Sequence, residues 1–289
     1  MGYVDDAFLN LKSTLEITKT EADMASRRHS RIRDRVRETW TLEDDFLTGS
    51  YRRDTKTKPL SDVDIFVVVN RSGPQAGLRK KSPESILRDL SDVLSPHFHR
   101  VSIDGMACVV EFGEDADVMS FDVVPAFKRT AKGGGYDIPD TRRGVWLATN
   151  PKTHHELSTA KNQACDEKYV PFIKMLKGVN LELGRPVPQS FLLEVMALSL
   201  VKEPFGRYQD ELRWFLATAV DSIHESWPDP AGLGPDVNTM TTAHRGTASN
   251  AFAQALITAE EAIRLEDDNQ ERAAVESWRR LMGWRMPRP

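Results

Sequence analysis

Apolar residues in the first 40 positions recur at the spacing of an α-helix. Phe8, Leu11 and Leu15 follow one another at intervals of three and four residues, and Ile32 and Val36 continue the stripe. Such a stripe lies on one face of a helix, because an α-helix completes a turn every 3.6 residues. No glycine or proline occurs between positions 3 and 48. The pattern therefore predicts one long helix over residues 3–40.

Shorter apolar runs separated by turn residues follow, up to about position 149. Residues 83–94 predict a helix, with Ser82 as its N-cap and Pro83 in its first turn. The apolar runs around this helix predict strands, which are expected over residues 65–69, 98–103, 106–112, 119–124 and 144–149. This half of the chain is therefore expected to hold a β-sheet with flanking helices.

The pattern changes near residue 150, where helical periodicity replaces the strand-like runs. The run FLLEVMALSLV is apolar almost throughout, as in a buried helix. Helices are expected over residues 154–165, 169–183, 190–201, 207–226 and 247–278. The sequence thus predicts an α+β fold in two domains, residues 1–150 and residues 151–289.

The composition is that of an ordinary globular protein, with 289 residues, 40% hydrophobic and 28% charged, and a net charge of −4. A negative net charge gives no basic field for tight binding of duplex nucleic acid. Two cysteines make no disulfide framework, which favours a reducing compartment. Because no apolar run reaches the length of a membrane span and the N-terminus lacks a signal-peptide pattern, we expect a cytoplasmic protein without membrane contact.

Candidate chemistry is concentrated in residues 48–69, TGSYRRDTKTKPLSDVDIFVVV. Asp62 and Asp64 open the apolar run, and residues two apart on a strand point to the same face. Like charges held so close are costly unless a cation shares them. Gly49 and Ser50 form a turn upstream, and the backbone N–H groups of such a turn suit a phosphate. The stretch predicts a nucleotide-polymerising site, with Mg²⁺ on the carboxylates and a triphosphate at the turn.

A two-metal site needs a third carboxylate from a neighbouring strand. Asp122 in MSFDVVPAF is the preferred candidate, because its neighbours are strand formers among which an aspartate is otherwise out of place. Asp115 and Asp117 are rivals in an acidic turn, where solvated carboxylates are expected. Carboxylates around two Mg²⁺ ions can lower the pKa of an attacking ribose hydroxyl and neutralise charge on the α-phosphate and the leaving pyrophosphate.

Simpler interpretations of these residues remain open. A D-x-D pair alone is a weak motif, and a turn-capping Asp62 with a surface Asp64 would explain it. The Gly-Ser turn, the strand after the pair and Asp122 together favour the metal site. The basic loop 52–58, which includes Lys56, is either a contact for phosphates or an ordinary solvated loop.

The order of these motifs resembles the polymerase-β-like nucleotidyltransferases, in which a Gly-Ser turn, a D-x-D pair before an apolar strand and a single strand aspartate follow one another. More narrowly, the N-terminal helix, SFDVVPAF, TNPKTHHEL and the helical second half resemble the cGAS/DncV-like nucleotidyltransferases (CD-NTases). These are bacterial relatives of cyclic GMP-AMP synthase and oligoadenylate synthase. The resemblance spans roughly residues 3–265.

The resemblance implies a role for each motif residue. Gly49 and Ser50 would bind the donor triphosphate. Asp62, Asp64 and Asp122 would hold two Mg²⁺ ions, for which Mn²⁺ is an alternative.

It also implies contacts from the helical half. A lysine there reaches the β- and γ-phosphates in the family, and PFIKMLKGVN offers Lys177, which is preferred, and Lys174. Their spacing puts both on one helix face, and two solvated lysines are the alternative. Ser190, which opens the next helix, would also meet the phosphates. Phe191 would stack on a base, unless it belongs to the core.

The fold implied by the resemblance is a polymerase-β-like core and a helical lobe that closes over the nucleotides, bridged by the long N-terminal helix. The implied reaction transfers a nucleotidyl group from ATP to a ribose hydroxyl, with GTP or another NTP as a second substrate. It would yield a cyclic oligonucleotide second messenger and pyrophosphate, in bacterial anti-phage (CBASS) signalling. A HORMA-like activating protein is the partner that the resemblance suggests.

Other functions are weighed against this one. The same superfamily includes template-independent enzymes that extend RNA 3′ ends, such as CCA-adding and poly(A) polymerases, and others that modify aminoglycosides or proteins. A non-catalytic nucleotide-binding regulator is a further alternative, which the presence of all three aspartates disfavours. His154, His155 and Cys165 lack the ligand spacing of a zinc site.

Overall fold

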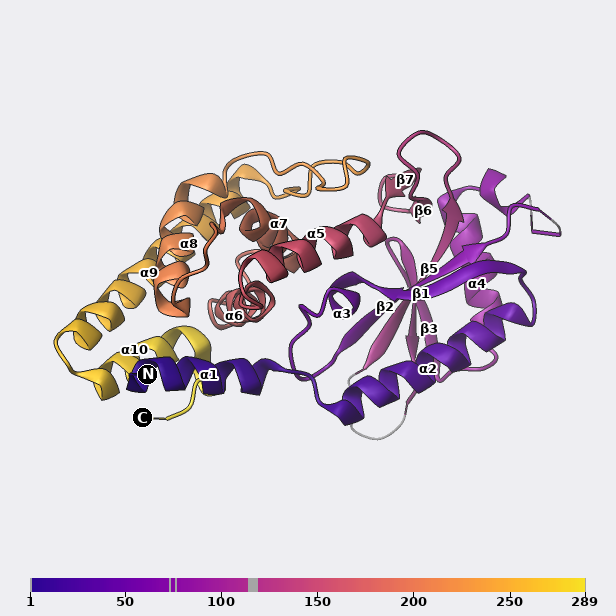
Figure 1. The fold of residues 1–289 in the computed structure, drawn as a ribbon. Helices are drawn as coiled ribbons and strands as arrows, with labels where there is room; N and C mark the ends of the chain where they lie inside the picture. Colours follow the sequence, from indigo (N-terminus) through magenta and orange to yellow (C-terminus); the bar gives the residue numbers. More distant parts are fainter. Residues whose placement is uncertain (1, 73, 76, 114–118, 289) are drawn as a thin grey trace. The chain divides into compact units, whose positions relative to one another are not determined.

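The computed structural model describes residues 2–72, 74–75, 77–113 and 119–288, which divide into two compact units (Figure 1). The sheet unit comprises Ile17–Glu156 with Ala231–Gly234, and the helical unit comprises the remaining described residues. One crossing between the units, after Glu156, lies close to the predicted boundary at residue 150, whereas the residues before Ile17 belong to the helical unit and Ala231–Gly234 to the sheet unit. Asp115 and Asp117, the rivals of Asp122, lie outside the described residues.

The sheet unit is built on a mixed sheet of seven described strands. Its main path runs in the order β1-β2-β5-β4-β3, with β6 paired to the end of β5 and β7 to β6. Only β2 and β5 pair in parallel among the described strands. The strands are β1 (Leu42–Thr48), β2 (Asp62–Val69), β3 (Arg100–Asp104), β4 (Ala107–Glu111), β5 (Ser120–Lys128), β6 (Tyr136–Asp140) and β7 (Val145–Thr149).

Both faces of β2 are covered, as its nearly unbroken apolar sequence requires. Ile65 and Val67 belong to one core, together with residues of helices α2 (Lys19–Arg37) and α4 (Pro83–Leu94). Phe66 and Val68, which point the other way, belong to a second core with Tyr136 of β6. The short helices α3 (Gly49–Arg52) and η1 (Leu78–Lys80) complete this unit, and α5 (Pro151–Ala164) begins in it.

Two strands are not predicted by the apolar pattern. β1 is missed because three of its seven residues are acidic. β6 is missed because three successive glycines, which are typical of a loop, directly precede it. The predicted strands at 65–69, 98–103, 106–112, 119–124 and 144–149 all overlap strands of the structure.

The N-terminal helical segment is confirmed, but as two helices rather than one. Helix α1 (Tyr3–Leu15) belongs to the helical unit and α2 to the sheet unit. The Thr18 hydroxyl accepts the Glu21 N–H at 3.2 Å, and the Glu21 carboxylate accepts the Thr18 N–H at 2.7 Å. This reciprocal capping box starts a new helix. The prediction of one helix over residues 3–40 is wrong on this point.

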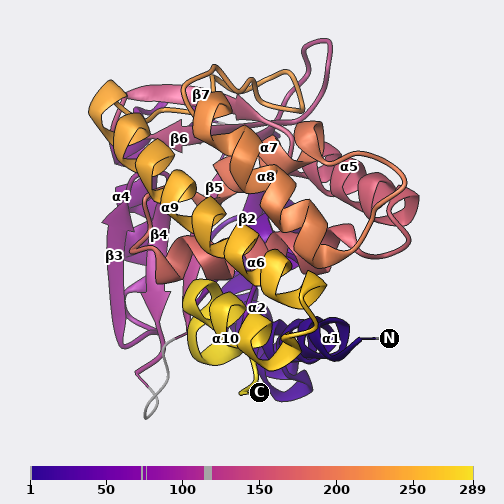
Figure 2. The ribbon, with the colours of Figure 1, turned by 90° about the vertical axis from the view of Figure 1, so that its left-hand side faces the viewer.

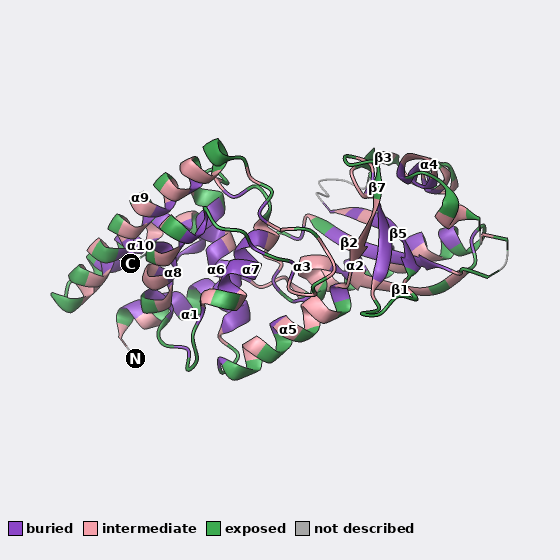
Figure 3. Ribbon diagram, turned by 90° about the horizontal axis from the view of Figure 1, so that it is seen from above, coloured by how far each residue is buried: buried purple, intermediate pink, exposed green. Residues whose placement is uncertain are grey.

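The helical unit encloses a single large apolar core. Phe8 of α1, Phe172, Phe215 and Trp278 are buried together there. Figure 2 shows the long α9 beside α8 and α10, and Figure 3 shows that α6 and α7 are buried along most of their length. The helices are α6 (Tyr169–Glu182), α7 (Ser190–Leu200), α8 (Tyr208–Ser222), α9 (Thr242–Asp267), α10 (Glu271–Met282) and η2 (Gly283–Arg285).

The predicted last helix over residues 247–278 is therefore two helices, because the chain turns at residues 268–270. None of the helices, over the stretches that the structure describes, is long and apolar enough to cross a membrane.

Candidate active site

The parallel pairing of β2 and β5 brings the predicted aspartates together. Asp64 lies directly opposite Asp122 in the register, and Asp62 lies opposite Ser120. Residues opposite each other on paired strands point to the same face of a sheet, as do residues two apart on one strand. The three carboxylates therefore share one face at the end of the sheet where β2 and β5 begin.

The Gly-Ser turn is packed against this carboxylate group. Thr48, the last residue of β1, pairs with Asp64, so that Gly49 follows at the strand end with a φ of +61°. A Cβ atom on Gly49 would lie 1.7 Å from the Asp64 Oδ2 atom and 2.6 Å from Cγ. Glycine is needed at position 49 for two reasons, the left-handed backbone and the contact with Asp64. The structure thus brings the predicted turn and the predicted aspartates into one site.

The pKa of the Asp122 carboxyl is raised from 3.8 to about 6, first by burial and then by the negative charges of Asp64, Asp62 and Asp104. Lys56 acts in the opposite direction. Like charges gathered in a partly buried place disfavour the charged form. Such a group of carboxylates is the environment of a cation site.

Lys56 places a positive charge beside the aspartates. Its Nζ atom lies 2.5 Å from the Asp62 Oδ1 atom, and the Ser61 hydroxyl donates to the same oxygen. The Asp62 side chain is 54% exposed and that of Lys56 only 13%. From the sequence, Lys56 belongs to a basic loop with two possible roles, a contact for phosphates or an ordinary solvated loop. The signal for its position is the carboxylate pair itself, which needs a cation close by.

The donor set suits Mg²⁺, which takes oxygen ligands and is commonly held by carboxylates. Among the residues that the structure describes, no group of three or more Asp, Glu, His and Cys side chains is arranged to hold an ion as it stands. Metal binding would require Asp62 to exchange Lys56 for the ion. The chemistry of the aspartates fits the ion, and the arrangement of their side chains is that of an ion pair with Lys56.

The two candidate lysines lie on α6 of the helical unit, in buried ion pairs. The Lys174 side chain is completely buried, and its Nζ atom lies 2.5 Å from Glu16 Oε2, just after the end of α1. Lys177 Nζ lies 2.8 Å from Glu194 Oε1 on α7, and these side chains are 11% and 7% exposed. The alternative of two solvated lysines is therefore wrong. Complete burial argues against a phosphate contact for Lys174.

Ser190 is the first residue of α7, as predicted. Phe191 is half-buried and packs against the core of the helical unit, which agrees with the core alternative stated for it. Both residues belong to the helical unit, whereas the aspartates belong to the sheet unit. Their roles at a triphosphate and a base stay predictions.

Sequence reasoning missed a cavity of about 560 Å³ beside β1 in the sheet unit. Thr48 and Phe46 line it and share the sheet face of Asp64, because they pair with Asp64 and Phe66. The first turn of α5 and helix α3 add basic side chains to its wall, from Arg52, Lys152 and His155. Its volume is within the range of small-molecule sites. No local motif marks it, since its walls come from segments about 100 residues apart in the sequence.

Comparison with known proteins identifies the family. Residues 1–162, more than half of the chain, match the family described as the Second Messenger Oligonucleotide or Dinucleotide Synthetase domain. A probable cyclic nucleotide synthase of Bacillus cereus is 27% identical, over 83% of this chain and 81% of its own. A cyclic AMP-AMP-AMP synthase of an Acinetobacter species is 26% identical, over 97% and 84%.

A solved structure shares the fold. The matching chain of the E. coli MS115-1 CdnC:HORMA-deltaN complex has a TM-score of 0.72 at 17% identity, and 96% of each chain is covered. The α+β architecture and the resemblance drawn from the motifs are thereby confirmed. This chain belongs to the family of second messenger oligonucleotide or dinucleotide synthetases, the CD-NTases.

Proposed function

We propose that this chain joins nucleotides from ATP into a cyclic oligonucleotide with release of pyrophosphate, in a Mg²⁺-dependent reaction. The observation that carries the proposal is the pairing of Asp64 with Asp122 on adjacent parallel strands, with Gly49 packed on the Asp64 carboxylate. A carboxylate group beside a phosphate-binding turn is what nucleotidyl transfer needs. Membership of the family supports the same reaction class.

The choice of ATP as substrate is supported by the Acinetobacter relative, whose name gives a product of three AMP units. That relative matches nearly the whole chain, at 97% coverage. GTP or another NTP as a second substrate remains part of the proposal. Ring size and linkage follow from the acceptor position, which is set by other residues than the aspartates.

Each aspartate has a proposed role. Asp62, Asp64 and Asp122 would hold the metal, which when bound supplies Lewis-acid stabilisation of charge on the phosphates and a lower pKa for the attacking hydroxyl. The pKa of Asp122 is raised, so its carboxylate is suited to accept the proton of a ribose hydroxyl. Lys56 would leave Asp62 as the metal binds.

The phosphates are assigned to the turn and to the helical unit. Gly49 and Ser50 open α3, where the first backbone N–H groups of a helix have no partner within the helix. Lys177 and Ser190 are proposed as phosphate contacts of the helical unit, with Lys177 released from Glu194. Lys174 is assigned instead to the ion pair with Glu16, which joins the end of α1 to α6.

The cavity beside β1 is proposed as a nucleotide pocket of this reaction. It borders Thr48, the residue before the Gly-Ser turn, and Arg52 of α3 lines it. Lys152 Nζ lies 4.7 Å from the centre of the Phe46 ring, so cationic and aromatic groups meet in its wall. Such a wall suits a base and a phosphate together.

A HORMA-like activating protein and a role in bacterial anti-phage signalling complete the proposal. Their support is the fold shared with the chain solved in the CdnC:HORMA-deltaN complex. Co-expression with a HORMA-like protein, followed by affinity purification, tests this partner independently of the reaction.

The reaction is tested by incubating the full chain with labelled ATP, alone and with other NTPs, in the presence of Mg²⁺ and with or without a HORMA-like protein. A labelled product that resists phosphatase is expected, because a cyclic product has no terminal phosphate. If no such product forms under any of these conditions, the proposed function is wrong.

A further inference from the structure

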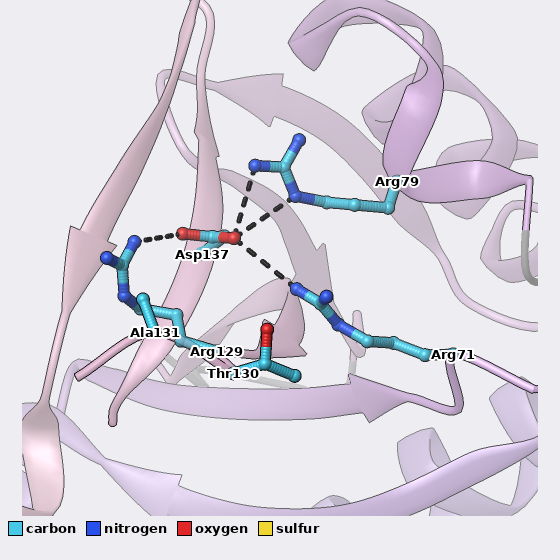
Figure 4. A pocket seen from close by; sticks show the side chains of 6 residues that line it. All are labelled: Arg71, Arg79, Arg129, Thr130, Ala131 and Asp137. Carbon is cyan, nitrogen blue, oxygen red and sulfur yellow. Dashed lines mark hydrogen bonds and ion pairs between the residues drawn. The ribbon is translucent and has the colours of Figure 1, made fainter. Parts of the chain in front are cut away.

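Three arginines surround one aspartate at the end of the sheet opposite to the active site (Figure 4). Asp137 Oδ2 accepts from Arg79 Nε at 3.2 Å and Nη2 at 3.1 Å, and Arg71 Nη2 lies 3.5 Å away. Arg129 Nη1 donates to Asp137 Oδ1 at 2.5 Å. Three guanidinium groups against one carboxylate leave an excess of two positive charges in this cluster.

The topology separates this arginine cluster from the catalytic aspartates. Arg71 follows the end of β2 at Val69, and Arg129 follows the end of β5 at Lys128. Because β2 and β5 are parallel, their carboxyl ends meet at one edge of the sheet and their amino ends, with Asp62 and Asp122, at the other. A strand rises about 3.3 Å per residue, so the eight residues of β2 place the two ends about 20 Å apart.

The cluster offers more hydrogen-bond donors than Asp137 can use. A guanidinium carries five N–H donors, whereas a carboxylate accepts at about four positions. Arg129 Nε is buried and has no hydrogen-bond partner among the described residues. A buried donor of a charged group that stays unpaired is costly. The surplus of donors and of charge together point to an anion as the missing partner.

The arginines line a small cavity of about 240 Å³ with Thr130 and Ala131, and the Thr130 hydroxyl points into the same space (Figure 4). Arg79 is fixed from behind, because its guanidinium lies 4.4 Å from the centre of the Trp146 ring. The Trp146 indole N–H donates in turn to the Lys81 carbonyl at 3.1 Å. The cavity is below the usual size of a site for a whole drug-sized ligand and is suited to a single anionic group.

We propose that Arg71, Arg79 and Arg129 form a second anion site, which binds a phosphate group. Arginine is suited to this ligand, because its planar fork of donors matches phosphate oxygens in pairs. The partial exposure of Arg71 and Arg79, at 37% and 33% of their side chains, leaves the cavity open to solvent. Asp137 acts as an internal anion that holds the three side chains in place.

Asp137 allows the site to be distinguished from a purely structural ion cluster. If the arginines serve only to stabilise Asp137, the variant Asp137→Asn loses stability and gains nothing from added anions. If they form a phosphate site, the same variant removes a competing negative charge. Phosphate should then bind more tightly to Asp137→Asn and raise its melting temperature more than that of the wild type.

The experiment measures binding to the full chain by isothermal titration calorimetry and by thermal unfolding, without divalent ions and at constant ionic strength set with chloride. Inorganic phosphate, pyrophosphate and AMP are compared, so that a free anion and a phosphate ester are told apart. Arg79→Gln and Arg129→Gln should each weaken phosphate binding about tenfold or more, since a charge-assisted hydrogen bond is lost. Arg100→Gln is the matched control, because Arg100 is an exposed arginine of the same unit, 66% accessible, paired with Glu111 at 3.8 Å.

Arg71 is the most exposed of the three arginines. If Arg129→Gln does not fold, phosphate binding is measured with Arg71→Gln instead. The proposal is overturned if wild-type unfolding responds to phosphate no more than to chloride, or if Arg79→Gln and Arg71→Gln bind phosphate as tightly as Arg100→Gln.

Discussion

The two ends of the parallel strands β2 and β5 carry opposite charge. At the amino ends, Asp62, Asp64 and Asp122 share one face of the sheet, and Lys56 pairs with Asp62. At the carboxyl ends, three arginines gather around the single Asp137. Like charges gathered in partly buried places are costly. On the two proposals made above, each end binds a ligand of the opposite sign, a cation at one and an anion at the other.

The largest effect is expected from Asp64→Asn. Metal-assisted stabilisation of the phosphates is worth several kcal/mol, so synthesis should fall on the order of 1,000-fold. The fold should be retained, since Asn keeps the size of the side chain. The matched control is Asp92→Asn, an exposed aspartate on α4. If the activity of Asp64→Asn in the phosphatase-resistance assay were within tenfold of that control, the acidic end would have no role in the reaction.

The next effect is expected from Gly49→Ala, which tests the contact of the turn with Asp64. The added Cβ would lie 1.7 Å from Asp64 Oδ2 and would force a left-handed alanine at a φ of +61°. The backbone strain costs about 1–2 kcal/mol, and displacement of Asp64 should lower activity about 100-fold.

Gly144→Ala is the control for this variant. Gly144 has a φ of +67°, and a Cβ there meets no atom of the described residues within 4 Å. It should therefore lose similar stability in thermal unfolding and keep its activity. Equal activity in the two alanine variants would show that the contact with Asp64 is unimportant.

A third prediction concerns the pH dependence of stability at the acidic end. The Asp122 carboxyl has its pKa raised from 3.8 to about 6, by burial first and then by the neighbouring carboxylates. A raised acid pKa stabilises the fold below pH about 4, and this contribution is lost as the pH rises through about 6. In EDTA at pH 7.5, Asp122→Asn should therefore be more stable than the wild type by about 2 kcal/mol.

The advantage of Asp122→Asn should vanish at pH 4 and shrink when Mg²⁺ is added to the wild type. Thermal unfolding at the two pH values, with Asp92→Asn alongside, measures it. A wild type that is the more stable protein at pH 7.5 in EDTA would contradict the account of charge at this end.

The smallest effect is expected from Lys56→Gln. If Lys56 occupies Asp62 in place of the metal, its removal should lower the Mg²⁺ concentration for half-maximal activity about two- to fivefold. This fold-change corresponds to the free energy of a partly exposed ion pair. Lys81→Gln is the matched control, since Lys81 forms a similar pair with Asp89 at 2.5 Å. A higher requirement for Mg²⁺ would instead assign Lys56 to the phosphates.

The acidic end could be predicted from the sequence, because short sequence patterns around each aspartate indicate it. Asp62 and Asp64 obey the period of a strand, and Asp122 stands out among strand formers. The contact between Gly49 and Asp64 could not be predicted, since it depends on the register that pairs Thr48 with Asp64. The pairing of Lys56 with Asp62 likewise depends on how the loop between α3 and β2 closes.

The basic end could not be predicted at all. Arg79 and Asp137 are 58 residues apart, and Asp137 reaches Arg79 from the strand β6. The glycine-rich sequence before β6 gives no indication of a strand. In the helical half, the apolar periodicity predicts the helices. It does not predict the ion pairs that the buried Lys174 and Lys177 form with Glu16 and Glu194. The break between α1 and α2 was readable in Thr18 and Glu21, although the apolar stripe continues across it.

Mass spectrometry of the product shows whether the acidic end builds a cyclic oligonucleotide from ATP, as proposed. Wild-type protein, ATP and Mg²⁺ should give a species made only of AMP units, without a 5′-triphosphate, which Asp64→Asn does not form. Linear chains that keep a 5′-triphosphate, or a product that appears only when RNA is supplied as acceptor, would contradict the account.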